Sequence, residues 1–178
     1  MDGTWPYASK VPTKSRGKIR MAQWNANGVL IKKLALTNFL YEEQVDIILI
    51  QKTHLKEGQR FWIRGYETFQ NDRADKRNGR IATLVKNNLA AAELAKLSGK
   101  MECLKIEIVT AKFNVLVANV YSPPNEEFDL GEITPRKENW LLLGDLNGDS
   151  PSWGYPDMDK KGEDIEDWMI DNQLVLVN

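Results

Sequence analysis

Cysteine, histidine and long apolar runs are all scarce in this chain of 178 residues. Cys103 is the only cysteine, so no internal disulfide can form, and we expect a reducing, intracellular compartment. We expect Cys103 itself to be a small buried apolar side chain rather than a reactive thiol. No apolar run approaches the ~20 residues of a transmembrane helix. Residues 1–17 lack the apolar segment of a secretory signal. The sequence therefore predicts no membrane partner.

The chain also lacks a large net charge of either sign. The formal net charge is −1 and the sequence pI is about 5.9, which argues against a strongly basic nucleic-acid binder. The charges are unevenly distributed, because basic residues concentrate in 1–40 and acidic residues in 125–178. This asymmetry allows a local basic surface, but proteins without a polyanionic partner often have it too.

The first part of the chain reads as strand, helix, strand. Residues 1–17 contain prolines, serines and basic side chains without periodicity, and we expect a mobile basic tail. Residues 18–24 alternate as a strand does, 29–44 carry apolar residues at helical spacing, and 46–50 form a continuous apolar run. Their combined length is that of a βαβ unit.

The rest of the chain is richer in predicted strands. We expect strands at 65–71, 81–85, 103–109, 113–121, 140–143 and 174–177. The alanine-rich stretch 89–96 predicts one or two helical turns, and 163–172 predicts a helix. Several strands are apolar on both faces, so the fold class is predicted to be α/β, with two packed sheets and helices outside.

The stretch Trp140–Asn147, WLLLGDLN, carries the most chemistry. Four apolar residues predict a strand buried on both faces, and it ends abruptly at Gly144 and Asp145. An ionised aspartate at the end of a dry strand needs a cation or several donors as partner. Magnesium is one such cation, although an ordinary turn also explains a Gly-Asp pair followed by Asn-Gly.

Three other predicted strands end in the same manner, at Asn25, Lys52 and Tyr121. Sites in open α/β sheets gather at the carboxyl ends of strands. If these strands point the same way, their end residues meet Asp145 in one oxygen-rich mouth. Such a mouth suits magnesium and phosphate chemistry.

Five short motifs, QWNANG, QKTH, VYSPP, GDLNG and PSWG, occur in this order between about Lys18 and Asn178. Together they resemble the endonuclease domain of non-LTR retrotransposons, within the endonuclease/exonuclease/phosphatase superfamily. The resemblance implies a four-layer α/β sandwich of two mixed sheets flanked by helices. It also implies magnesium-dependent hydrolysis of phosphodiesters, nicking of target DNA, and a reverse transcriptase domain in a longer polyprotein. The nucleus is then a candidate location.

The resemblance also implies roles for individual residues. Asn25 and Asn27 match the residues for metal and phosphate after the first strand, and Tyr121 matches a tyrosine that binds the scissile phosphate. Asp145 and Asn147 match the pair that positions the attacking water.

The departures from the family pattern matter equally. Lys52 stands where the family has a metal-ligating glutamate, so we expect magnesium binding to be weakened or lost. NGRIA, residues 78–82, replaces a glycine-rich run, and Asp149 and Ser150 stand where two histidines are common. In the family, the strand like 174–177 is followed by a further part that holds an Asp-His pair. Residues 18–178 are therefore expected to be a domain lacking its last part, weak or inactive as a nuclease.

Nucleic-acid contacts are the last group of candidates. Trp153 lies in a polar loop and could stack on a base, whereas Trp24, Trp140 and Trp168 fall in periodic elements and are expected in the core. Arg73, Arg77 and Arg80 belong to a basic stretch that could follow a DNA backbone or simply be solvated. His54, the only histidine, is expected to have a local rather than a catalytic role. Two other functions stay open: a non-catalytic nucleic-acid-binding remnant, and a phosphatase of the same superfamily acting on small phosphoesters.

Overall fold

The computed structural model describes residues 18–71, 80–110, 112–127, 133 and 139–177. The predicted mobile tail, 1–17, and the candidates Arg73 and Arg77 lie outside these residues. The described strands form two four-stranded mixed sheets. No helix in the described part is both long and apolar enough to cross a membrane.

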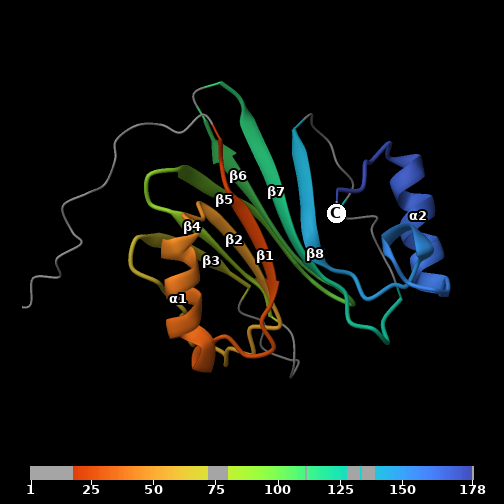
Figure 1. Cartoon of the computed structure of the whole chain (residues 1–178), viewed down its shortest axis with the longest axis horizontal. Helices are drawn as coiled ribbons and strands as arrows, with labels where there is room; N and C mark the ends of the chain where they lie inside the picture. Colours follow the sequence, from red (N-terminus) through yellow and green to blue (C-terminus); the bar gives the residue numbers. More distant parts are fainter. Residues whose placement is uncertain (1–17, 72–79, 111, 128–132, 134–138, 178) are drawn as a thin grey trace, which may run out of the picture.

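The first sheet is built around the buried strand β2. Its order is β1-β2-β4-β3, where β1 is parallel to β2 and the other neighbours are antiparallel. The parallel pair needs a crossover, which a short 3-10 helix, η1, and helix α1 supply (Figure 1). The bounds are β1 Met21–Asn25, η1 Leu30–Lys32, α1 Lys33–Glu42, β2 Ile47–Gln51, β3 Tyr66–Gln70 and β4 Ala82–Lys86.

The second sheet has the order β5-β6-β7-β8, antiparallel up to β7 and parallel between β7 and β8. The hairpin predicted between 103–109 and 113–121 is present as β6 and β7. The bounds are β5 Ala90–Ser98, β6 Glu102–Val109, β7 Asn114–Tyr121, β8 Trp140–Asp145, η2 Pro151–Trp153 and α2 Lys160–Asp171.

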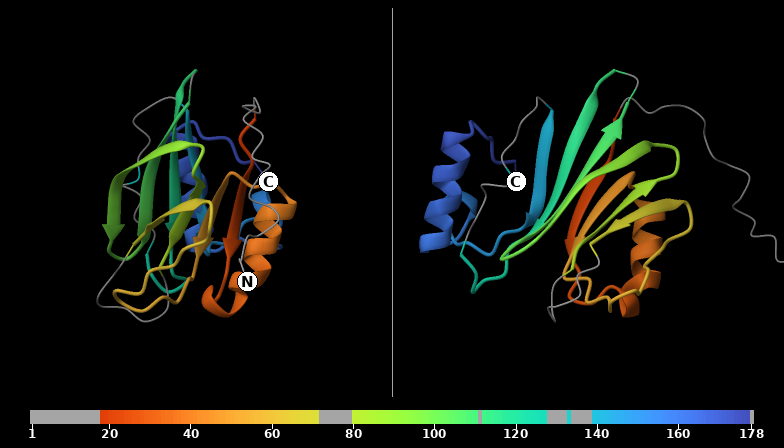
Figure 2. Two further views of the ribbon diagram at one scale, coloured as in Figure 1. Left: turned by 90° about the vertical axis from the view of Figure 1, so that its left-hand side faces the viewer. Right: turned by 180° about the vertical axis from the view of Figure 1, so that it is seen from behind.

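Apolar side chains fill three layers of the molecule. Ile47 and Leu49 of β2 pack against Leu104 and Ile106 of β6 between the two sheets. Leu36 and Leu40 of α1 cover the outer face of the first sheet, and the two helices lie at opposite sides of the molecule (Figures 1 and 2). Trp168 of α2 meets Trp140 of β8, with ring centroids 6.1 Å apart. The predicted sandwich of two packed sheets with helices outside is confirmed.

The predicted helical turns at 89–96 are wrong. This stretch is strand β5, which pairs with β6 along its length apart from a bulge between Glu93 and Ala95. Alanine favours a helix locally, but that preference is weak and tertiary pairing overrides it. The hydrogen bonds offered by β6 decided the outcome.

Two expectations about strands, one for 174–177 and one for 140–143, are also wrong. The described segment 174–177 forms no strand, and Val175 and Val177 are 83% and 87% exposed. A strand needs a hydrogen-bonded neighbour, and no described strand pairs with this segment. Strand β8 is at a sheet edge rather than buried on both faces, and Leu141 is 43% exposed.

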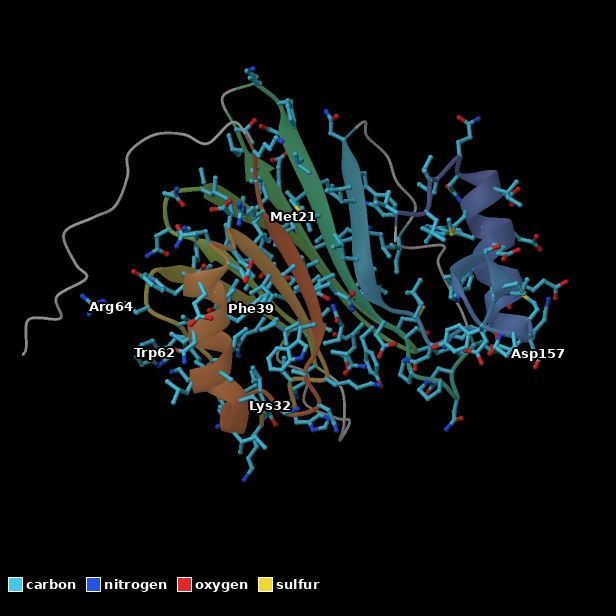
Figure 3. The ribbon with its side chains drawn as sticks, viewed as in Figure 1. Met21, Lys32, Phe39, Trp62, Arg64 and Asp157 are labelled. Carbon is cyan, nitrogen blue, oxygen red and sulfur yellow. The ribbon has the colours of Figure 1, made fainter. Side chains whose placement is uncertain are left out.

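Four strands finish on the same side of the two sheets. Register pairs Asn25 with Gln51 at the ends of β1 and β2, and Tyr121 with Asp145 at the ends of β7 and β8. Figure 3 shows Met21 near the start of β1 and Lys32 at the other end of the molecule, beyond the finish of β1. This shared end, called the mouth below, holds Asn25, Lys52, Tyr121 and Asp145.

Candidate active site

Asp145 is the centre of the mouth. Its Oδ2 accepts a hydrogen bond from Asn25 Nδ2 at 2.6 Å and lies 3.1 Å from Lys52 Nζ. Asn25 belongs to the first sheet and Asp145 to the second, so this carboxylate joins the two sheets. The side chains of Lys52 and Asp145 are 24% and 18% exposed, and the ion pair is therefore open to solvent on one side.

Gly144 allows β8 to lie close to β7 just before Asp145. A Cβ at position 144 would lie 2.1 Å from the carbonyl oxygen of Val120, which is far inside van der Waals contact. Beyond the strands, the backbone N–H of Ser122 donates to the carbonyl of Asp145 at 2.9 Å. The close approach and this bond fix where the carboxylate projects.

A chain of amides behind the mouth, buried at Gln51 and Asn119, links the strands, and the sequence reasoning missed it. Gln23 Nε2 donates to Gln51 Oε1 at 2.9 Å, and Gln51 Nε2 donates to Asn119 Oδ1 at 2.7 Å. Asn119 Nδ2 donates in turn to the carbonyl of Ala82 at 3.0 Å. The sequence feature that could have revealed these amides is a polar residue within or at the end of each apolar run.

Lys52 is held in place by its backbone as well as by Asp145. Its φ is 50°, in the left-handed region, and its carbonyl accepts from the N–H of Gly28 at 2.9 Å. Nζ lies 5.3 Å from the centre of the Tyr121 ring, within the range of a cation–π contact. A backbone conformation that lysine rarely adopts therefore points its ammonium group at the mouth.

The ring of Tyr121 lies beside the ammonium group of Lys52. Its side chain is only 4% exposed and belongs to the core between the sheets. Burial raises the pKa of Tyr121, and the charges of Asp145 and Glu102 raise it further. The hydroxyl therefore stays protonated at neutral pH, but little of the side chain is available to a ligand.

The two other predicted asparagines lie around the mouth rather than at Asp145. Asn147 donates from Nδ2 to the carbonyl of Ser122 at 2.9 Å and braces the loop after β7. Asn27 is exposed, has φ 44°, and follows β1. The ammonium group of Lys32 binds the carbonyl of Ala26 and lies 3.5 Å from that of Asn27.

Lys161 of α2 is a further cation near the mouth, and no feature of the sequence singled it out. Its Nζ donates to the carbonyl of Pro123 at 2.6 Å, two residues beyond Tyr121. Burial lowers the pKa of Lys161, while Asp159, Asp145 and Glu126 raise it in opposition. Helix α2 thus brings a second ammonium group into the electrostatic field of Asp145.

Known proteins were compared with this chain by sequence and by fold. The family model described as endonuclease-reverse transcriptase matches residues 115–178. The RNA-directed DNA polymerase from mobile element jockey of Drosophila melanogaster is 24% identical over 165 residues, which is 89% of this chain and 18% of the relative. The endonuclease domain of TRAS1, a telomere-specific non-LTR retrotransposon, superposes with a TM-score of 0.74 at 18% identity, covering 90% of this chain and 74% of that structure. The chain is thus similar, in sequence and in fold, to the endonuclease domains of non-LTR retrotransposons.

Further relatives agree with this family. The probable RNA-directed DNA polymerase from transposon X-element of Drosophila melanogaster is 24% identical over 163 residues, 88% of this chain and 18% of its own length. The chain thus spans less than a fifth of the curated relatives it matches. An AP endonuclease of Leishmania major superposes with a TM-score of 0.60 at 17% identity, covering 85% of this chain and 66% of that structure. The chain therefore shares its fold with these two endonucleases.

The mouth of this retrotransposon-type domain does not fit a magnesium ion. The described residues contain no group of three or more His, Cys, Asp or Glu side chains that could hold a metal. Oδ2 of Asp145 already accepts a hydrogen bond from Asn25 and forms an ion pair with Lys52. A divalent ion ~4 Å from an ammonium group would be repelled by about 8 kcal/mol at an effective dielectric constant of 20.

The candidate nucleic-acid residues that the structure describes are mostly engaged. Arg80 is 9% exposed, so its side chain is not a surface cation. Trp153 lies in η2, is partly buried, and donates from Nε1 to the carbonyl of Gly148 at 2.9 Å. This hydrogen bond holds the Trp153 ring in a fixed orientation. The role of the ring in stacking stays a prediction.

Proposed function

We propose that this domain engages the phosphodiester backbone of DNA at the mouth, and that by itself it hydrolyses that backbone weakly or not at all. The observation that carries the proposal is the position of Lys52 Nζ, 3.1 Å from Asp145 Oδ2 and within the junction of the two sheets. The nuclease fold and the mobile-element relatives support DNA as the partner. A reverse transcriptase domain in the same longer protein is part of the proposal.

The weak activity follows from the state of Asp145. To orient an attacking water, a carboxylate must offer an oxygen to it within hydrogen-bond reach. Here Asn25 and Lys52 both bind Oδ2, so this oxygen is already engaged. Asn147, the other candidate for positioning water, uses its amide group on Ser122.

Nicking of a supercoiled plasmid tests this proposal. With magnesium present, conversion to the open circle should stay near the rate of a protein-free control, and Asp145→Ala should change it little. Asp157→Ala is the matched control, because Asp157 is an exposed carboxylate in the loop before α2 (Figure 3). Rapid nicking that Asp145→Ala abolishes and Asp157→Ala leaves intact would overturn the claim of weak activity.

A non-catalytic role in binding nucleic acid is the second candidate, favoured by the same engaged carboxylate. Its signature is DNA affinity that falls steeply with salt and is weakened by Trp153→Ala and Arg77→Ala. Turnover of a small phosphoester, with none of DNA, would instead support a phosphatase of this superfamily.

A further inference from the structure

Three ammonium groups are fixed around the end of the two sheets. Lys32 binds the carbonyl of Ala26 in the loop after β1, Lys52 binds Asp145, and Lys161 binds the carbonyl of Pro123 in the loop after β7. Each lysine is therefore attached to a different part of the mouth. Two of the three bind neutral carbonyls, so their charges are not cancelled by the group that holds them.

Lys52 keeps donors for a ligand. An ammonium group has three N–H donors, and among the described residues the ion-pair partner of Lys52 is Asp145, with Nζ 3.1 Å from Oδ2. The pair is partly exposed, and the ring of Tyr121 occupies one side of Nζ. The remaining donors of Lys52 are thus free to meet an anion that approaches from solvent.

We propose that the mouth binds a phosphate ester without a divalent metal, with Lys52 as the cation that contacts the phosphate oxygens and Lys161 beside it. The proposal rests on the proposed function, because the phosphate ester is a phosphodiester of DNA. Lys52 neutralises Asp145, and so removes the repulsion that this carboxylate would otherwise exert on an incoming phosphate. A magnesium ion normally does both tasks in oxygen-lined phosphate sites, and the mouth of this domain does not fit that ion.

Fluorescence anisotropy with a labelled DNA duplex at low salt tests the inference, first in EDTA and then with magnesium. The unchanged chain should bind in EDTA, and magnesium should weaken binding only as much as screening by a matched concentration of another salt. Lys52→Gln should weaken binding in EDTA by about ten- to hundredfold, the usual range for one charge-assisted hydrogen bond. Lys52→Arg keeps the charge and should bind within about threefold of the unchanged chain.

Lys86→Gln is the matched control. Lys86 lies at the end of β4 and pairs with Asp46 at 3.7 Å, with side-chain exposures of 32% and 16%, close to those of the Lys52–Asp145 pair. It lies at the opposite end of the first sheet, since Asp46 precedes β2. This variant removes the same charge and a similar ion pair, and its affinity for DNA should change less than about threefold.

The outcomes separate the inference from the function on which it rests. Binding that requires magnesium, or equal loss in the Lys52→Gln and Lys86→Gln variants, overturns the inference and leaves DNA engagement standing. If the unchanged chain binds neither the duplex nor inorganic phosphate in either buffer, both proposals fail. If Lys52→Gln does not fold, two measurements still test the inference. They are DNA binding by the unchanged chain in EDTA and in magnesium, and DNA binding by the Lys52→Arg variant.

Discussion

At the scale of single residues, Gly144 determines where the central carboxylate lies. Because glycine has no Cβ, β8 can pass close to the backbone of β7 at this position. A Cβ added there would lie 2.1 Å from a carbonyl oxygen of β7. No other residue type can occupy this position without moving one of the two strands. The glycine therefore has a packing role, next to a residue with a proposed chemical one.

Gly144→Ala should lower the free energy of unfolding by about 1–3 kcal/mol, because the added methyl group overpacks the β7–β8 contact. Urea denaturation measures the loss. Gly99→Ala is the control, since an added Cβ there meets no atom within 4 Å and its effect should stay within about 0.5 kcal/mol. Equal stabilities for the two variants would contradict the close approach of β8.

Cys103 and Lys52 differ in how deeply their polar groups are buried. Cys103 is 1% exposed, and burial raises the pKa of its thiol from 9.0 to about 12, so the thiol is neutral and unreactive at neutral pH. The prediction of a small buried apolar side chain is confirmed. Lys52 remains partly exposed and pairs with a carboxylate.

At the scale of elements, the chain of amides connects strands that the apolar core alone would not hold in one alignment. Gln23 of β1, Gln51 of β2 and Asn119 of β7 form one hydrogen-bonded chain. Asn119 is 0% exposed and bonds to β4 as well, through the carbonyl of Ala82 and the hydroxyl of Thr83. Because unmade buried hydrogen bonds are costly, the chain favours one alignment of the two sheets.

Asn119→Ala should destabilise the fold by about 1–3 kcal/mol, because the amide of Gln51 and the carbonyl of Ala82 lose their partner in a dry interior. Chemical denaturation monitored by tryptophan fluorescence gives the change. Asn114→Ala removes an exposed asparagine from the same strand, with a single bond to Glu107 at 3.3 Å, and should cost less than about 0.5 kcal/mol. If both variants unfold at the same denaturant concentration, the amide chain does not hold the sheets together.

At the scale of the whole molecule, the mouth exists only because two sheets meet. Asn25 and Lys52 come from one sheet, and Tyr121 and Asp145 come from the other. A ligand bound there contacts both sheets and should stabilise the entire fold. Thermal unfolding therefore reports on occupancy of the mouth.

Magnesium should leave the melting temperature of the unchanged chain where it is, apart from the effect of ionic strength. Lys52→Glu places a second carboxylate beside Asp145 and should confer magnesium binding. At about ten times the Kd, the ion should then raise the melting temperature by about 3–5 °C.

Lys112→Glu, at an exposed position between β6 and β7, controls for the change in net charge and should show no response to magnesium. A saturable rise of the melting temperature in the unchanged chain would contradict the poor fit of the mouth to this ion. Metal binding by Lys52→Glu without nicking of a plasmid would assign the loss of metal affinity to Lys52 and the loss of activity to other features.

The sequence by itself determined the elements whose apolar periodicity is strong, including β1, β2, α1, the β6–β7 hairpin and α2. It also marked the residues at the strand ends, because a polar side chain that follows a dry run is visible in one dimension. Only the tertiary structure decided that 90–98 is a strand, that β8 is an edge, and that Asn119 links three strands. These features depend on hydrogen bonds to partners distant in the chain, which local propensity does not contain. The pairing of Lys52 with Asp145 is of the same kind, because 92 residues lie between two charges that folding brings to 3.1 Å.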